Sequence, residues 1–330
     1  TEEPTPTPDA SLIVPATDAS VFPFTGLRPQ DPAHLARRPL AIKVANQASV
    51  NPQSGLNMAD VVVESRVEYS ETRYTVIYHS QSAERVGSIR SARLIDRDLP
   101  VIFDAVLCFS GAVQPVREML YSSDLSDQII EQALNGPSYY RDPNINVPDN
   151  LFADTAALWN TVAYYDYDTP PQPTGAFFFR QAPPDAPAAS RVDIPYPRFA
   201  VRWTYDPGSG RWLRQMGGNP HIDAVSGEQL SAANVVVLGV NHVTTLILEH
   251  GSQMAYDNAG NCINCSIEIQ LWGEGPLKIL RDGKVVDGKW VRAERFAPFR
   301  FLDAGGNDIP LKPGNSWWQV TPLGMGVSVQ

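Results

Sequence analysis

A proline-rich segment separates two halves of the chain that have different apolar patterns. Residues 169–197 are dominated by prolines and small residues, with one strand-like run at 177–180. Strand and helix patterns alternate before this segment, whereas short strands and frequent turns follow it. Such a segment is typical of a domain boundary. The sequence therefore predicts an α+β or α/β N-terminal domain and a mostly β C-terminal domain, divided as a tether at 1–21, the first domain at 22–168, the boundary segment at 169–197 and the second domain at 198–330.

The first half carries the signals of a sheet covered by helices. Strand-like runs occupy residues 40–44, 61–67, 73–79 and 105–109, and helical patterns occupy 92–99, 114–120 and 155–164. Asp154 is a suitable N-cap for the last helix. In the strand at 73–79 apolar and polar residues alternate, so we expect one packed face and a second face shared by Arg73 and His79.

The second half carries the signals of β-hairpins. Turn sequences occur at 205–210 and at Asp282-Gly283, and strand-like runs occur at 234–238, 266–271, 284–286 and 317–321. Six of the seven tryptophans lie here, namely Trp203, Trp212, Trp272, Trp290, Trp317 and Trp318. Such residues fill the core of a small β domain, and the alternative is a surface that contacts carbohydrate.

Composition limits the classes of partner. The chain has 330 residues, of which 43% are hydrophobic, and a formal net charge of −10. It is long enough for a large core, and it lacks the basic stripe that binds nucleic acid. No apolar run reaches the roughly 18 residues that a membrane span needs. We therefore expect a globular protein with no nucleic-acid partner and no span of its own.

The chain begins with a Thr/Pro tract at residues 1–8 that cannot bury apolar area. We interpret it as the extended tether of a mature exported protein, because such tracts commonly follow a cleaved signal or a lipid-modified cysteine. Neither is present in the sequence. The alternative is a simple disordered tail.

The cysteines and histidines favour a structural disulfide over a metal site. Cys108 lies in an apolar run and is expected to be a small buried side chain. Cys262 and Cys265 form a single C-x-x-C without the second pair that a zinc site needs, so a local disulfide is the preferred interpretation. The five histidines are scattered, and Glu249-His250 matches no metal motif and is expected to be a solvated pair. We expect no metal and no cofactor.

Charged and polar residues gather in the first half near the ends of predicted strands and helices. The candidate ligand-binding residues are Asn46, Glu64, Glu68, Arg73, Arg90, Ser91, Arg93, Ser110 and Asn150. Ser91 is a candidate N-cap for the helix at 92–99, which places Arg93 in the first turn, where the helix dipole disfavours a cation. Free N–H groups and arginines suit an anion or the carboxylates of Glu64 and Glu68. The alternative is an internal salt-bridge network.

A hydrolase is the main catalytic alternative, with Glu68 as the candidate catalytic residue. Two carboxylates that flank a glycosidic bond can act as acid and as base or nucleophile. Glu64 and Glu68 lie four residues apart in or near one strand, which separates them by about 13 Å if the strand is fully extended. That distance is too long for either hydrolytic geometry unless the chain bends at Arg66 or Val67. Binding is therefore favoured over catalysis.

A family resemblance covers about residues 22–325. The first half resembles the N-terminal domain of the YerB-type bacterial lipoproteins at 22–27, 38–42, Asn46, 52–56, Ala59-Asp60, Glu68, Thr72-Arg73 and Gly87-Ser88-Ile89-Arg90-Ser91-Ala92-Arg93. The second half is similar to that family's C-terminal domain at 203–206, 210–214, 234–238, 282–284, 288–290 and 311–317. The chain departs from the family pattern at Asp149-Asn150, where His-Asn is usual, and at Tyr69-Ser70-Glu71, where glycines are usual.

The resemblance implies an extracytoplasmic, membrane-anchored lipoprotein of the cell envelope whose function is unknown. It implies no reaction, and it gives the Thr/Pro tract its meaning as a tether behind a lipidated cysteine. Three hypotheses remain. The first is binding of an anionic or glycan-like envelope ligand at Arg73, Arg90 and Arg93. The second is a hydrolase acting on envelope polymers through Glu68, and the third is an assembly or regulatory partner of cell-wall enzymes in which the charged cluster is structural and the β domain makes the contact.

Overall fold

The computed structural model describes residues 14–15, 20–172 and 177–330. The predicted tether at 1–21 lies almost entirely outside these described residues. The α-helices are α1 (Leu99–Phe103), α2 (Gln114–Tyr121) and α3 (Thr155–Tyr164). The 3-10 helices are η2 (Pro32–Leu35), η3 (Ala48–Val50), η4 (Leu56–Met58), η5 (Glu68–Ser70), η6 (Leu94–Arg97) and η7 (Gly136–Ser138).

Strands make up most of the regular structure. Those before the proline-rich segment are β1 (Val14–Pro15), β2 (Leu40–Ala45), β3 (Val61–Arg66), β4 (Thr72–Tyr78), β5 (Val86–Gly87), β6 (Val106–Phe109), β7 (Ile129–Glu131), β8 (Tyr139–Arg141) and β9 (Leu151–Ala153). Those within and after it are β10 (Phe178–Phe179), β11 (Arg191–Ile194), β12 (Val201–Asp206), β13 (Arg211–Met216), β14 (Asn219–Pro220), β15 (Ser231–Ala232), β16 (Asn234–Val240), β17 (His242–Leu248), β18 (Cys265–Ile269), β19 (Gly273–Arg281), β20 (Lys284–Arg292), β21 (Arg300–Leu302), β22 (Ser316–Pro322) and β23 (Ser328–Val329).

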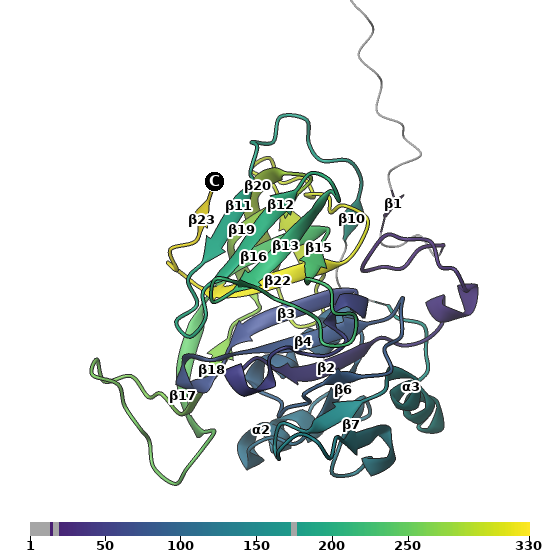
Figure 1. The fold of residues 1–330 in the computed structure, drawn as a ribbon, viewed down its shortest axis with the longest axis vertical. Coiled ribbons are helices and arrows are strands. Elements are labelled where there is room, and N and C mark those ends of the chain that lie inside the picture. Colours follow the sequence, from purple (N-terminus) through teal and green to yellow (C-terminus); the bar gives the residue numbers. More distant parts are fainter. Residues whose placement is uncertain (1–13, 16–19, 173–176) are drawn as a thin grey trace, which may run out of the picture.

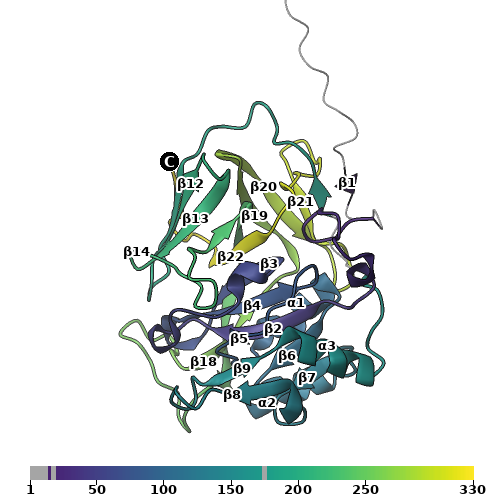
Figure 2. The same cartoon turned by 45° about the vertical axis from the view of Figure 1, so that its right-hand side comes forward.

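One ten-stranded sheet runs through both halves of the chain (Figures 1 and 2). Its strand order is β21-β20-β19-β16-β22-β3-β4-β2-β6-β7. β22, from near the C-terminus, pairs in parallel with β3, so Trp317 lies opposite Val62. The mixed first half and the mostly β second half confirm the predicted fold class. The two halves nevertheless share their largest sheet.

Both faces of the ten-stranded sheet are covered, which explains the long apolar runs of its strands. One face packs against α1, α2 and β18 through residues such as Ile102, Leu120 and Ile269. The other face packs against α3 and against a second sheet of order β14-β13-β12-β11-β23, which contributes the buried Trp203 and Trp212. The two halves are thus held together by a common core as well as by strand pairing.

β4 differs from the expected one-sided strand. All of its residues are buried, with Tyr74 on one face and Ile77 on the other, and His79 is buried just beyond its end. The expectation of a polar face shared by Arg73 and His79 was wrong because helices cover that face as well. Buried polar groups there are paired internally, as where Lys43 Nζ donates to Asp96 Oδ1 at 2.9 Å.

The segment after Ser91 also differs from the prediction. No helix begins at residue 92; the 3-10 helix η6 begins at Leu94, with Arg93 at the N-cap position, and α1 begins at Leu99. The Asp96 carboxylate accepts the Arg93 N–H at 2.7 Å, which supplies the cap that was assigned to Ser91. Arg93 therefore precedes a single short turn, and the helix-dipole argument does not apply to it.

Several local predictions are confirmed. Asp154 caps α3 by accepting the Ala156 N–H at 2.7 Å. The turns at 205–210 and at Asp282-Gly283 join β12 to β13 and β19 to β20. Cys262 and Cys265 form a disulfide, and Cys108 is buried and free. Of the six tryptophans in the second half, five are core residues and only Trp272 is exposed.

Candidate functional site

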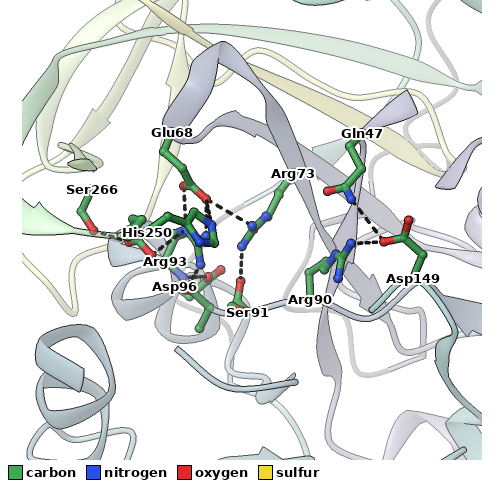
Figure 3. A network of polar contacts seen from close by, with 12 residues as sticks. Gln47, Glu68, Arg73, Arg90, Ser91, Arg93, Asp96, Asp149, His250 and Ser266 are labelled. Atoms are coloured by element: carbon green, nitrogen blue, oxygen red, sulfur yellow. Dashed lines mark hydrogen bonds and ion pairs between the residues drawn. The ribbon is translucent and has the colours of Figure 1, made fainter. Parts of the chain in front are cut away.

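The predicted site residues gather at the strand ends on one side of the ten-stranded sheet. β2, β3 and β6 run in the same direction and β4 runs against them. The C-terminal ends of β2, β3 and β6 therefore lie on the same side of the sheet as the start of β4. This brings Asn46, Glu68 and Arg73 to neighbouring strand ends. Figure 3 shows that the charged side chains form separate groups along these strand ends.

Glu68 is the centre of the first group. Arg93 Nε donates to Glu68 Oε2 at 2.8 Å, Arg93 Nη2 donates to Oε1, and Arg73 Nη2 donates to Oε1 at 3.2 Å. The residue is 4% exposed. Burial alone would raise the pKa of Glu68, but the hydrogen bonds and charge of Arg93, helped by Arg73, lower the pKa to about 2. Glu68 is therefore a permanently ionised counter-ion of two arginines.

A hairpin from the second half completes this group. β17 and β18 form a separate two-stranded sheet, and the residues after β17 reach the arginines of the first half. Glu249 Oε2 lies 3.2 Å from Arg93 Nε, and His250 Nε2 lies 3.4 Å from Glu68 Oε1. The Ser266 hydroxyl donates to Glu249 Oε1, as drawn in Figure 3. The expectation of a solvated Glu249-His250 pair was wrong for Glu249, which is buried.

The turn before β4 is tied to the same hairpin. Tyr69 and Ser70 have positive φ values of 57° and 60°, in the left-handed region that favours glycine. The Tyr69 N–H donates to the Ile263 carbonyl at 2.6 Å, inside the loop closed by the Cys262–Cys265 disulfide. The Tyr69 ring lies 6.0 Å from that of His250, and both side chains are exposed.

Arg90 belongs to a second group. Its Nη2 donates to Asp149 Oδ1, and its Nη1 donates to the Pro148 carbonyl at 3.2 Å. Gln47 Nε2 donates to the same Asp149 oxygen at 3.2 Å. Ser91 takes part in the first group through its backbone, because its carbonyl accepts Arg73 Nη1 at 2.9 Å.

Ser110 and Asn150 lie at the margins of these groups. The Ser110 N–H donates to the Arg90 carbonyl at 3.1 Å. The Asn150 amide contacts Arg141 at 2.6 Å and the Asp142 carbonyl at 3.3 Å, so its described bonds order the loop at 141–150.

Asn46 and Glu64 belong to a third group, buried between the ten-stranded sheet and the second sheet. Glu64 Oε2 accepts Arg214 Nη2 at 2.9 Å, and Glu64 Oε1 accepts the Asn46 amide at 3.2 Å. Arg214 Nε donates to His221 Nδ1 at 2.9 Å, and His221 Nε2 lies 2.6 Å from Gln53 Oε1. The Gln53 amide donates to Asn46 Oδ1 at 3.0 Å, which closes a ring of five side chains.

The directions of these bonds assign the protonation of His221. Because Arg214 can only donate, His221 Nδ1 accepts, and Nε2 carries the proton given to Gln53. Burial, followed by the charge of Arg214, lowers the pKa of His221 well below 6.5, which keeps the ring neutral. The predicted pairing of Glu64 with Glu68 in one site is not observed, since β3 ends at Arg66 and Glu68 lies in the turn η5.

The positive and negative charges along these strand ends balance one another. Arg73, Arg90 and Arg93 face Glu68, Glu249 and Asp149, each within ion-pair distance of at least one opposite charge. The partners Glu249, His250, Asp149 and Arg214 were not among the predicted site residues. Three of them come from the second half, and no local pattern signals which distant arginine a lone carboxylate will meet.

The part of the chain that the structure describes has no group of three or more His, Cys, Asp or Glu side chains placed to hold a metal ion. None of the helices in the described ranges has the length and apolar character needed to cross a membrane.

Comparison with known proteins identifies the family. Residues 24–168 match the N-terminal domain model of a protein family of unknown function, DUF3048, and residues 192–318 match its C-terminal domain model. The chain is 26% identical to "Putative lipoprotein YerB" of Bacillus subtilis (strain 168) over 308 residues, which cover 91% of this chain and 86% of that protein. The crystal structure of the YerB protein from Bacillus subtilis has the same fold, with a TM-score of 0.79, 23% identity, and coverage of 94% of this chain and 99% of the other. The chain therefore belongs to the DUF3048 family of YerB-like proteins, which pair an N-terminal and a C-terminal domain of unknown function.

Proposed function

We propose that this protein is an extracytoplasmic, membrane-tethered envelope lipoprotein that acts without catalysis, by binding an extended segment of a partner protein along the β17–β18 hairpin. This corresponds to the assembly or regulatory hypothesis, in which the charged cluster is structural. The tether and the location are supported by the Thr/Pro tract and by the name of the Bacillus relative.

The proposal rests on the structural role of the charged cluster, which consists of Glu68, Arg73, Arg93 and Glu249. Arg93 contacts Glu68 of the first half and Glu249 of the hairpin at once. Buried and mutually neutralised, these groups have little charge left for an anionic ligand, but they fix the base of the hairpin to the body. A rigid base suits a hairpin that makes contacts elsewhere.

The hairpin exposes apolar side chains and an unpaired strand edge. Leu246 is 81% exposed and Val243 is 39% exposed, both on β17. In the described sheets β17 pairs only with β18, so its other edge is open to a further strand (Figure 1). An exposed edge with apolar residues is the feature that accepts an added strand from another chain. Addition of a strand satisfies the open backbone groups and covers Leu246 together.

The hydrolase alternative is not favoured by the geometry. A general acid needs a pKa near the working pH, whereas the pKa of Glu68 is lowered to about 2. Both carboxylate oxygens are also held by arginine. Glu68 is thus suited to hold Arg93 and Arg73 in place.

A glycan-like ligand is a second candidate, favoured by one observation. The exposed Tyr69 ring lies 6.0 Å from the ring of His250, which itself contacts Glu68, and Tyr69 has a left-handed backbone conformation. Strained backbone of this kind is concentrated at functional sites, and aromatic rings bind the flat faces of sugars. Binding of soluble cell-wall glycan fragments should then be lost in Tyr69→Ala and kept in Tyr256→Ala, where a tyrosine of similar exposure lies on the hairpin loop.

Site-directed crosslinking tests the main proposal. A photoreactive residue at Thr244 of the full-length, membrane-anchored protein should give one identified partner, and Leu246→Lys should abolish that product because a charge blocks strand addition. Leu134→Lys, which changes an exposed leucine of the first half, is the matched control and should leave the product intact. Equal crosslinking in wild type and Leu246→Lys contradicts the proposal.

A further inference from the structure

We propose that a pocket in the second half, beside the point where the N-terminal segment enters the fold, is a binding site for a phosphate group. The pocket has a volume of about 390 Å³ and is lined by Arg180, Arg281, Asp282 and Lys312, among others. It is separate from the charged cluster of the first half. The inference therefore adds a ligand to a protein proposed above to bind a partner through its hairpin.

Positively charged side chains outnumber negatively charged ones in the pocket. Three cations and one carboxylate line it, in a chain whose formal net charge is −10. Arg73, Arg90 and Arg93 are matched in number by Glu68, Glu249 and Asp149, whereas here Arg281 and Lys312 share the single carboxylate of Asp282. Arg180 is exposed, and its described side-chain bond, to the Asp308 carbonyl, is 3.5 Å long. The pocket thus keeps positive charge that its own residues do not neutralise.

The buried Arg281 and the half-buried Lys312 are fixed before any ligand arrives. Arg281 Nε and Nη2 lie 2.8 and 2.7 Å from Asp282 Oδ2, and Arg281 Nη1 donates to the Arg180 carbonyl at 2.6 Å. Lys312 Nζ lies 2.9 Å from Asp282 Oδ1 and donates to the Gly210 carbonyl at 2.7 Å. Asp282 therefore holds a guanidinium and an ammonium in a fixed relation without cancelling both.

Phosphate matches this arrangement of donors. The planar fork of an arginine binds two phosphate oxygens, and a lysine adds a compact point charge. Arg180, whose exposed side chain has one described bond of 3.5 Å, supplies the fork, and Lys312 retains an N–H beyond its two described contacts. A ligand with two or more negative oxygens can engage both cations at once.

The position of the pocket links it to the tether. Val14 and Pro15 of β1 pair with Phe179 and Phe178 of β10, directly before Arg180. Figure 1 shows β1 and β10 side by side, so Val14 and Pro15 lie near the pocket that Arg180 lines. In a protein tethered through the residues before Val14, the phosphates of membrane lipids are one available source of the ligand. A soluble or polymer-borne phosphate ester offers the same chemistry from a second source.

Calorimetry on the intact chain tests the site with inorganic phosphate and glycerol phosphate as probes. Arg180→Ala and Lys312→Ala should each weaken binding roughly tenfold. Arg198→Ala removes a charge at the other end of β12 and should leave affinity unchanged. Thermal melting of each variant checks that the fold is retained.

A vesicle arm separates the two sources of phosphate. Cosedimentation with phosphatidylglycerol vesicles that is lost in Arg180→Ala supports the site and assigns it to lipid head groups. Saturable glycerol phosphate binding without vesicle binding supports the site and assigns it to soluble esters. Absence of saturable binding in both arms, or equal binding by wild type, Arg180→Ala and Lys312→Ala, overturns the inference. Leu246→Lys should bind phosphate like wild type, which keeps this result independent of the hairpin proposal.

Discussion

Two buried arginine–glutamate groups join the halves of this protein, and they differ in what surrounds them. The ring of Arg214, Glu64, Asn46, Gln53 and His221 is closed on itself between two sheets. The cluster around Glu68 and Arg93 is equally buried at its centre but is covered by the exposed His250 and Tyr69. The ring has no route to solvent through its own members, whereas the cluster ends at a surface. The first is suited to hold the halves together, and the second to position the hairpin.

The largest expected effect comes from breaking the ring. Arg214→Met leaves Glu64 as an uncompensated buried carboxylate, and removal of one partner of such a pair costs about 3–5 kcal/mol. Urea unfolding measures the change. Arg198→Met, which removes an exposed arginine of the same half, should cost less than about 0.5 kcal/mol. A loss below about 1 kcal/mol for Arg214→Met shows that the ring is not a principal link between the halves.

A smaller and more local effect is expected from the cluster. Glu68→Gln removes the charge that Arg93 and Arg73 share, at a cost of about 2–4 kcal/mol, and loosens the hairpin that Arg93 holds. Hydrogen exchange should rise first in β17 and β18. His250→Ala is the control. The His250 ring lies 3.4 Å from Glu68, but it is exposed, so this contact should add little to stability. Uniform loss of protection across the ten-stranded sheet contradicts a local role.

The pH dependence of stability should report on the cluster around Glu68. The folded pKa of Glu68 is about 2, below its ordinary value of 4.5. Its contribution is therefore complete above about pH 4.5 and is lost as pH falls toward 2, by up to roughly 3 kcal/mol. The free energy of unfolding measured from pH 5 to pH 2 should fall less steeply in Glu68→Gln than in wild type. Parallel curves for the two proteins argue against the lowered pKa.

The smallest effect is expected from the strained turn. Ser70 has a φ of 60°, so Ser70→Gly relieves a left-handed conformation while increasing the freedom of the unfolded chain. The net change should be a stabilisation of about 0.5 kcal/mol, measured as a small rise in Tm. Ser82→Gly, at an exposed position without positive φ, should show no such rise. Destabilisation by Ser70→Gly indicates that the serine side chain matters more than the strain.

Local patterns in the sequence anticipated the features that local physics determines. The strand ends predicted that Asn46, Glu68 and Arg73 lie near one another, and the short Cys262–Cys265 spacing predicted the disulfide. The pairing of β22 with β3 joins residues more than two hundred positions apart, and no turn or periodicity specifies it. For the same reason the sequence did not predict the partners Glu249 and Arg214. Without these counter-ions, the arginines at the strand ends were interpreted as an anion site.

The insertion of β22 into the centre of the large sheet has a consequence for folding. β3 pairs with β4 on one side, and its other neighbour is a strand that ends at Pro322. During synthesis from the N-terminus, β3 therefore lacks this neighbouring strand until residues 316–322 have been made. Such long-range closure slows folding and exposes intermediates to aggregation. The ten-stranded sheet is therefore completed only after β22 has been made, which couples the folding of the first half to that of the second.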